Sequence, residues 1–302
     1  MWGVARLAMR GPLVAPLVIA AFALLAMIFV PALIVSGGLL GLVTLRHGAF
    51  EGLRTLLIAG ALTLGVLLLI NGRLGAAAAS VFAAWLPVWS ASQTLRRTGQ
   101  QGAALANIGI CAAGYAGLMR LANPDVDAFW RGRLTALGSA VEAQGGKFLT
   151  TNEITLVGNL MHQVSIALLC TGLISMLLLG RWWQAGLYNP GGFRQEFYAL
   201  AVPRWLSPLA VGAALASLIL KTQGGGAGAA GDFVLVLVLV FSLQGLAILH
   251  ASCAAKALTR GWLVGAYVML GVVPQFVVPL LAVLGIADGT RKFRARLKVS
   301  EE

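Results

Sequence analysis

The sequence predicts an all-α, polytopic membrane protein with about eight spans and a broken or re-entrant helix pair near its C-terminal end. Of the 302 residues, 59% are hydrophobic and only 11% are charged, and the mean hydropathy is +0.88. A soluble domain of this composition would lack the polar residues needed to cover its surface. The apolar residues also form runs of about 20, the length that crosses a bilayer core. We therefore expect one integral membrane domain over residues 1–302.

The lengths of the apolar runs locate the expected spans. Residues 12–45 carry no charge and are too many for one crossing. Pro31 and the small residues Ser36, Gly37 and Gly38 offer places for the chain to fold back, so we expect two helices here, the second one short. Further spans are expected at 54–71, 74–92, 102–121, 161–180, 206–221 and 233–250.

The last apolar run, 261–286, contains Pro274 and Pro279 and permits either one crossing or a fold-back. We favour the fold-back, because proline disrupts a continuous helix and because basic residues concentrate on the cytoplasmic side of membranes. A fold-back places the basic tail 287–302 on the same side as the basic N-terminal segment. Both termini are then expected to be cytoplasmic.

The formal charge of +12 does not indicate nucleic acid as a partner. The basic residues lie in small clusters between apolar spans, which is the distribution of loops that set membrane topology. The cysteines Cys111, Cys170 and Cys253 lie in or beside apolar segments at unrelated spacings, so neither a disulfide framework nor a metal site is expected. No cofactor is expected, and membrane lipids are the expected surroundings.

Residues 122–160 are expected to form an outer loop that contains an interfacial helix. Trp130, Leu134, Leu137 and Val141 fall on one helical face, and we expect this helix to end at a pair of glycines, 145–146.

Residues 181–204 are expected to form a cytoplasmic loop. The segment begins with Arg181 and two tryptophans, Trp182 and Trp183, the residue types of a membrane–water boundary. The sequence NPGG at 189–192 then predicts a break, because proline lacks a backbone N–H and glycine permits positive φ. Phe197 and Leu200 follow at helical spacing, which predicts a short helix on the membrane surface.

The spans lack the residues of ordinary catalysis. All ten acidic residues are expected in loops or at helix ends, and no metal-protease, nucleophile-elbow or Cys/His motif is present. We therefore expect no enzymatic activity, and the absence of a mid-membrane acid also argues against proton-coupled transport. The polar residues Asn159, His162 and Gln163 share a helical face at the start of a span, where they could form a rim for a small polar or amphipathic ligand. Hydrogen bonding between helices is the alternative interpretation.

Several motifs resemble the YybS-like family of bacterial membrane proteins. They are LVTLR at 42–46 with Gly48, GRWWQ at 180–184, LYNPGGFR at 187–194 with Glu196, Phe197 and Leu200, and LGI at 284–286 with Asp288. One departure is Ala201 and Val202, where the family pattern predicts an Arg-Leu pair.

The resemblance implies a fold similar to the S components of energy-coupling-factor transporters and to MreD-like proteins, and a bacterial inner-membrane location. By analogy with S components, a ligand would bind near Asn159, His162 and Gln163, under the outer loops. A protein partner would dock at the cytoplasmic face, on a surface formed by Asn189, Gly191, Gly192, Arg194 and Glu196.

Two functions follow as hypotheses. The first is a small-molecule binding or transport subunit that works with a partner. The alternative is a scaffold or assembly factor that transports nothing and recruits partners through 181–204.

Overall fold

The computed structural model describes residues 2–71, 76–223, 228–255 and 258–291, and all regular structure within them is α-helical. The first part of the chain forms α1 (Trp2–Ala8), α2 (Val14–Leu25), α3 (Ala32–His47), α4 (Ala49–Asn71), α5 (Ala76–Thr98) and α6 (Gln101–Ala122). The second part forms α7 (Val126–Glu142), α8 (Thr151–Tyr188), α9 (Gly192–Tyr198), α10 (Leu206–Thr222), α11 (Gly228–Ala254), α12 (Gly261–Val272) and α13 (Pro274–Arg291). The predicted all-α class is confirmed.

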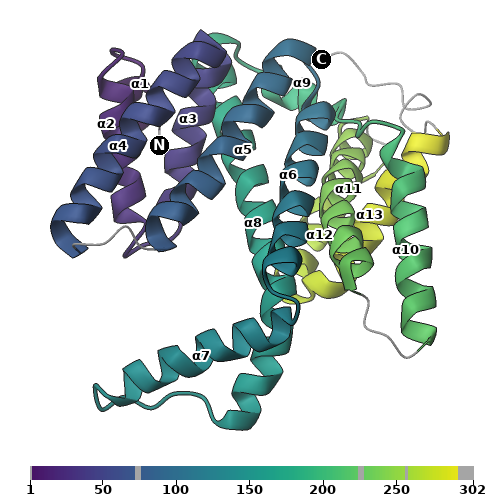
Figure 1. Ribbon diagram of the computed structural model, residues 1–302. Coiled ribbons are helices and arrows are strands. Elements are labelled where there is room, and N and C mark those ends of the chain that lie inside the picture. The colour runs from purple at the N-terminus through teal and green to yellow at the C-terminus, as the bar shows by residue number, and fades with distance from the viewer. Residues whose placement is uncertain (1, 72–75, 224–227, 256–257, 292–302) are drawn as a thin grey trace.

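The helices form one bundle with α8 near its middle (Figure 1). Helices α1 to α5 lie on one side of α8, and α10 to α13 lie on the other. Two groups of buried apolar side chains follow this division only in part, because α3 and α5 contribute members to both. Ile19, Leu40 and Trp85 belong to the first group, whereas Ile108, Ile166 and Phe241 belong to the second. Helix α8 contributes to both groups, so it connects the two halves.

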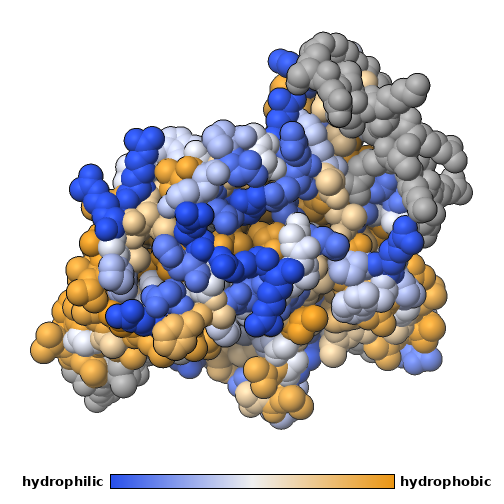
Figure 2. Space-filling view, turned by 90° about the horizontal axis from the view of Figure 1, so that it is seen from above, coloured by the Kyte–Doolittle hydropathy of each residue, from blue (hydrophilic) through white to orange (hydrophobic). Residues whose placement is uncertain are grey.

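The two ends of the bundle differ in composition. We call the end that carries α9 and the α1–α2, α3–α4 and α5–α6 connections the α9 face, and the opposite end, from which α7 projects, the α7 face (Figure 1). Basic residues occupy the last turns of helices that end at the α9 face, among them Arg46, Arg96 and Arg97. Figure 2 looks onto this face and shows hydrophilic side chains across it, bordered by hydrophobic ones.

Four helices, α4, α6, α8 and α11, are long and apolar enough to cross a membrane. The shorter apolar helices are α2, α3, α10, α12 and α13. Each expected span coincides with a helix, whereas the exact number of crossings stays a prediction.

Residues 12–45 form two helices as predicted, but the expectation that the second is short is wrong. The chain turns at 26–31, and α3 is longer than α2. Ser36, Gly37 and Gly38 lie inside α3, where their small size permits close packing on α8. A Cβ on Gly180 of α8 would lie 2.7 Å from the backbone oxygen of Gly38.

The predicted break at Pro274 is also present, since α12 ends at Val272 and α13 begins at Pro274. Pro279 lies inside α13, which continues to Arg291. The first residues of the tail 287–302 are therefore helical, and 292–302 fall outside the described residues.

Helix α8 has 38 residues and so spans roughly 57 Å, more than the ~30 Å of a hydrocarbon core. Its first turns project from the bundle together with α7 (Figure 1). A capping box fixes the start of α8. The Thr150 side chain accepts a hydrogen bond from the Glu153 backbone N–H, and the Glu153 carboxylate accepts one from the Thr150 backbone N–H. The helix expected within 122–160 is thus present as α7, although Leu137 is 53% exposed.

Helices α11 and α13 approach closely through two glycines. A Cβ on Gly245 would lie 2.6 Å from the Leu281 carbonyl carbon, and one on Gly285 would lie 3.2 Å from the Gly245 nitrogen. Alanine at either position would force the two backbones apart.

We expect Gly245→Ala to lower the free energy of unfolding by about 1–3 kcal/mol, the usual cost of overpacking. Gly212→Ala is the matched control, because its Cβ would meet nothing within 4 Å in the apolar helix α10. Thermal unfolding of the purified protein in detergent measures both. Equal unfolding temperatures for the two variants would contradict the close approach of α11 and α13.

Candidate functional site

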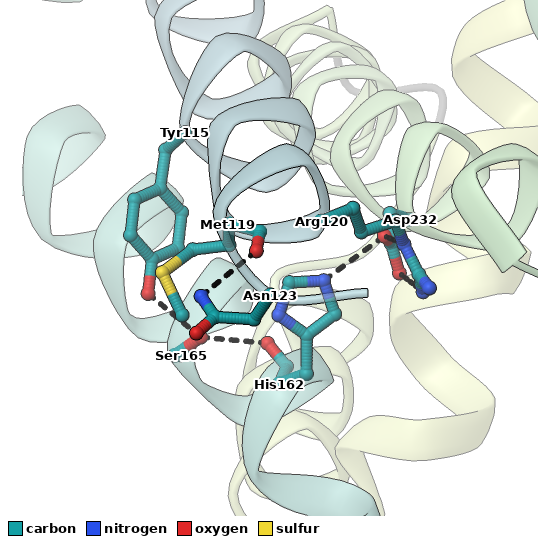
Figure 3. A network of polar contacts seen from close by, with 7 residues as sticks. All are labelled: Tyr115, Met119, Arg120, Asn123, His162, Ser165 and Asp232. Carbon is teal, nitrogen blue, oxygen red and sulfur yellow. Dashed lines mark hydrogen bonds and ion pairs between the residues drawn. The ribbon is translucent and has the colours of Figure 1, made fainter. Parts of the chain in front are cut away.

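Three ionisable side chains from three helices meet inside the bundle, toward the α7 face (Figure 3). Arg120 of α6 donates to both carboxylate oxygens of Asp232 of α11, from Nε to Oδ2 at 2.5 Å and from Nη2 to Oδ1 at 3.0 Å. His162 of α8 lies with its Nε2 3.0 Å from Asp232 Oδ2. Asp232 and His162 are 3% and 2% exposed, so water does not solvate either side chain. We call these three residues the Asp232 triad.

The expectation that all acidic residues lie in loops or at helix ends is wrong for Asp232. Helix α11 begins at Gly228, so Asp232 lies one turn inside it, among side chains of α6 and α8. An unpaired carboxylate there would lose its hydration without compensation. The bidentate guanidinium of Arg120 supplies that compensation.

The hydrogen bonds of the Asp232 triad define the tautomer of His162. A carboxylate that accepts from Arg120 on both oxygens is ionised and acts only as an acceptor. The proton of the His162–Asp232 contact must therefore reside on Nε2, which leaves Nδ1 as an unprotonated acceptor. Nδ1 is buried and has no hydrogen-bond partner among the described residues.

A second set of contacts holds the backbone of α8 beside the triad. The Tyr115 hydroxyl of α6 donates to Ser165 Oγ at 3.1 Å, and Ser165 Oγ donates to the His162 backbone oxygen at 2.7 Å (Figure 3). Ser165 thus bonds to the backbone of His162 and not to its ring. A nucleophile–base pair would require the ring contact, so the geometry is not that of a hydrolase triad.

A cavity of about 350 Å³ adjoins the Asp232 triad, between α6 and α11. Its walls are small apolar residues of both helices together with two larger side chains, Asp232 and Phe233. Gly117 lies on this wall, and a Cβ there would meet nothing within 4 Å. The cavity therefore combines apolar walls with one charged group, the composition usual for small-molecule sites.

The structure separates the three residues predicted to form a ligand rim. His162 is buried in the Asp232 triad, whereas Gln163 is exposed. Asn159 accepts a 2.6 Å hydrogen bond from Arg131 of α7. Only His162 belongs to the Asp232 triad, and a ligand-binding role for any of the three stays a prediction. Arg120 and Asp232 were missed because each stands at the end of an apolar run, where a charge is usually solvated.

A second ionic network lies at the α9 face. Arg181 of α8 is 9% exposed and donates to both carboxylate oxygens of Glu196 of α9, with a distance of 2.8 Å from Nε to Oε2. It also donates to Gln184 Oε1 at 2.7 Å. Gln101 at the start of α6 donates to Glu196 Oε2 at 3.3 Å. These contacts bind α9 to α8 and α6.

The predicted loop 181–204 is partly wrong in its extent. Helix α8 runs through to Tyr188, so 181–188 are helical, and the predicted break follows at Asn189. Gly191 has φ +85°, a left-handed conformation that favours glycine, and the predicted surface helix is present as α9. Trp183, expected at the membrane boundary, is instead fully buried, while Trp182 packs 4.4 Å from Trp2 between ring centroids.

The residues predicted to form a partner-docking surface differ in accessibility. Asn189, Gly191 and Arg194 are exposed, and Arg194 donates to the Tyr198 hydroxyl at 2.7 Å. Gly192 is buried, and Glu196 is bound to Arg181. A docking role for this surface stays a prediction.

The connection after α9 is also fixed by hydrogen bonds. Gln244 of α11 accepts from the Val202 backbone N–H at 2.8 Å and donates to Asp288 of α13 at 3.5 Å. Gln244 thus links helix to helix, and it holds the segment where the sequence departs from the YybS-like pattern. Among the described residues, no group of three or more His, Cys, Asp or Glu side chains is placed to hold a metal ion.

Residues 156–289 match a family described as predicted membrane protein (DUF2232). The matched part includes His162, Arg181, Glu196 and Asp232 but begins after Arg120. Comparison with curated proteins and with solved structures gave no match. The match and the apolar helices together indicate an integral membrane protein.

Removing one partner of the Arg181–Glu196 pair should detach α9 from α8. We expect Glu196→Gln to lower the free energy of unfolding by about 2 kcal/mol, below the ~3–5 kcal/mol typical of fully buried pairs because Glu196 retains some solvent. Arg194→Ala is the control, since Arg194 is exposed and should change stability by about 0.5 kcal/mol or less.

Limited proteolysis at 199–205 and thermal unfolding measure the effect. The paired substitution Arg181→Met with Glu196→Leu should recover part of the loss, because no unpaired charge then remains. Glu196→Gln behaving like Arg194→Ala would contradict an anchoring role for this ion pair.

Proposed function

We propose that this protein binds a small molecule in the cavity beside Asp232 and acts as a binding or transport subunit of the bacterial inner membrane. The observation that carries the proposal is a paired but buried carboxylate on the wall of an otherwise apolar cavity, within membrane helices. Ionisable residues in such positions are costly, and their usual role is functional. The free Nδ1 of His162, close to this carboxylate, supports the same interpretation.

The proposed orientation places the α9 face in the cytoplasm, together with both termini. Arg6 and Arg46, in the last turns of α1 and α3, lie at this face, in agreement with the positive-inside rule. The cavity then opens toward the outer side, where the α7 segment projects. An S-component-like fold would also place its ligand on that side.

A non-catalytic role accords with the contacts around the cavity. Ser165 and His162 lack the ring contact that would activate a nucleophile, and Asp232 is neutralised by Arg120. Binding and release of a ligand require neither an activated nucleophile nor an unpaired carboxylate.

The alternative function is a scaffold that recruits a protein at the α9 face. Two exposed side chains favour it, Arg194 on α9, which the Arg181–Glu196 pair anchors, and Asn189 just before this helix. The exposed guanidinium of Arg194 offers a contact for an acidic group of such a partner.

Ligand binding is tested by the thermal stability of the purified protein with vitamins, nucleobases and isoprenoid or lipid head groups. We expect at least one ligand to raise the unfolding temperature, because a ligand that binds only the native state stabilises it by mass action. The stabilisation should be lost in Gly117→Leu, which fills the cavity.

Gly114→Leu is the matched control for this substitution. It lies one turn earlier on α6, where a Cβ also meets nothing within 4 Å, and it does not line the cavity. Failure of every ligand to stabilise the protein, or equal loss in both leucine variants, would count against the proposed site.

Orientation is tested with single cysteines in a background free of Cys111, Cys170 and Cys253. We expect Lys147→Cys, in the α7–α8 connection, to react with an impermeant thiol reagent added to intact cells after removal of the outer membrane. Arg194→Cys on α9 should react only after the inner membrane is opened, and the reverse order would invert the proposed topology.

A further inference from the structure

A second cavity continues the one beside Asp232 along the same side of α6. It has a volume of about 50 Å³ and lies between α6, α11 and the start of α10, where Trp205 forms part of its wall. The two cavities share Phe233 of α11 as a wall residue. They therefore form one groove between α6 and α11, which we call the α6–α11 groove.

The α6 wall of this groove follows one face of the helix. Its residues recur at intervals of three and four positions, and they are Ala106, Gly109, Ile110, Ala113, Ala116 and Gly117. From Ala106 to Gly117 the helix rises by roughly 16 Å, about half of the ~30 Å hydrocarbon core. The α6–α11 groove is therefore about as long as the apolar layer of one leaflet of a bilayer.

The α6–α11 groove is open toward the outside of the bundle. Ile110 on its wall is 59% exposed, and Leu118, next to Gly117 on α6, is 67% exposed. Because α6 is long and apolar enough to cross a membrane, exposed apolar side chains along it contact lipid chains. A hydrocarbon chain can thus enter the groove sideways from the bilayer, without passing through water.

Asp232 gives one end of the α6–α11 groove a hydrogen-bond acceptor. An ionised carboxylate has about four lone-pair sites. Three of them accept from Arg120 Nε, Arg120 Nη2 and His162 Nε2. The described part of the chain leaves one site on Oδ1 unused. Because Asp232 lies on the cavity wall, a ligand that donates a single hydrogen bond would complete the set.

The charges at this end of the groove favour an uncharged donor. The guanidinium of Arg120 already neutralises the carboxylate of Asp232. A cationic head group would give the site a net positive charge, and an anionic one would approach a carboxylate. Both arrangements are costly beside a buried side chain, because water screens little there. A hydroxyl supplies a donor and adds no charge.

We propose that the α6–α11 groove binds a single-chain lipid alcohol, with its hydroxyl on Asp232 and its hydrocarbon chain along α6 toward Trp205. The proposal rests on the proposed function in taking the cavity beside Asp232 as the ligand site, and it names the class of ligand. The chain matches the groove in length and polarity, and the hydroxyl matches the acceptor at its end. In the proposed orientation the ligand belongs to the outer leaflet, with its head group at the membrane edge.

The test uses the full chain in lipid nanodiscs and a photoreactive hexadecanol that carries a diazirine in the middle of its chain. Mass spectrometry locates the labelled residues. A cavity of about 610 Å³ between α11, α12 and α13 has no charged residue on its wall, so labelling of α12 serves as the reference for lipid contact without head-group selection.

Unlabelled hexadecanol and its methyl ether, which lacks the donor, then compete with the probe. We expect the ether to require about tenfold more to displace the probe from the α6–α11 groove, close to the smallest effect of a hydrogen bond to a charged group. At α12 the two competitors should be equivalent.

Two variants test the path of the chain. Ala113→Phe places a large side chain in the groove, on the same helical face as Gly109 and Ile110, and should remove most of the groove labelling. Gly114→Phe is the matched control, because Gly114 does not line the groove and a Cβ there meets nothing within 4 Å. Its labelling should equal that of the native chain.

Three results would overturn the proposal: equal competition by the alcohol and the ether, stronger competition by hexadecylamine or hexadecyl phosphate, or equal labelling of the two phenylalanine variants. Should Ala113→Phe fail to fold, competition on the native chain still decides the matter. A water-soluble ligand that stabilises the native chain but not Gly117→Leu, together with equal competition by alcohol and ether, would keep the proposed function and remove the lipid alcohol. No groove labelling and no stabilising ligand would remove both.

Discussion

The structure depends on one constraint: a charge inside an apolar helix bundle must be paired by another helix. Asp232 meets this requirement through Arg120 of α6 and His162 of α8, and Arg181 meets it through Glu196 of α9. The partners of Asp232 lie 70 and 112 positions from it in the sequence, whereas Arg181 and Glu196 lie on consecutive helices. Because breaking such a pair leaves a buried charge without compensation, each pair disfavours arrangements that would separate its two helices.

Helix α8 carries one member of each network. His162 and Arg181 are 19 positions apart, which corresponds to roughly 28 Å along a helix and is close to the ~30 Å of a hydrocarbon core. The two networks therefore lie near the two edges of the expected apolar layer. The long extension of α8 beyond His162 belongs to the α7 segment outside this layer, which explains how a helix of 38 residues is accommodated.

The position of the Asp232 triad bears on its chemistry. Near an edge, a proton or a small ligand can reach the triad from one side without crossing the bilayer. A relay across the whole membrane would need ionisable groups at the midplane, and the triad does not supply them. The arrangement suits recognition of a small ligand from the α7 face. The DUF2232 match covers His162 and Asp232 but not Arg120, so one partner of the buried carboxylate lies outside the matched region.

Much of the fold could be predicted from the sequence, because hydropathy and proline act locally. The runs of apolar residues located the spans, Pro274 located the C-terminal break, and 189–192 located the end of α8. The site could be predicted only in part. His162 was singled out as a polar residue within a span. Its grouping with Asn159 and Gln163 rested on helical spacing alone, and spacing does not show which face of α8 a neighbouring helix covers.

The sequence by itself thus determined that the chain is a membrane protein and where its helices are interrupted. The length of an apolar run and the effect of proline or glycine on the backbone are local properties, so they can be predicted without knowing which distant residues lie nearby. Only the tertiary structure decided that Asp232 is buried, that Trp183 lies in the core and not at the membrane boundary, and that Arg181 pairs with Glu196. Burial and pairing depend on which helices pack together, and the residues concerned lie between 15 and 112 positions apart.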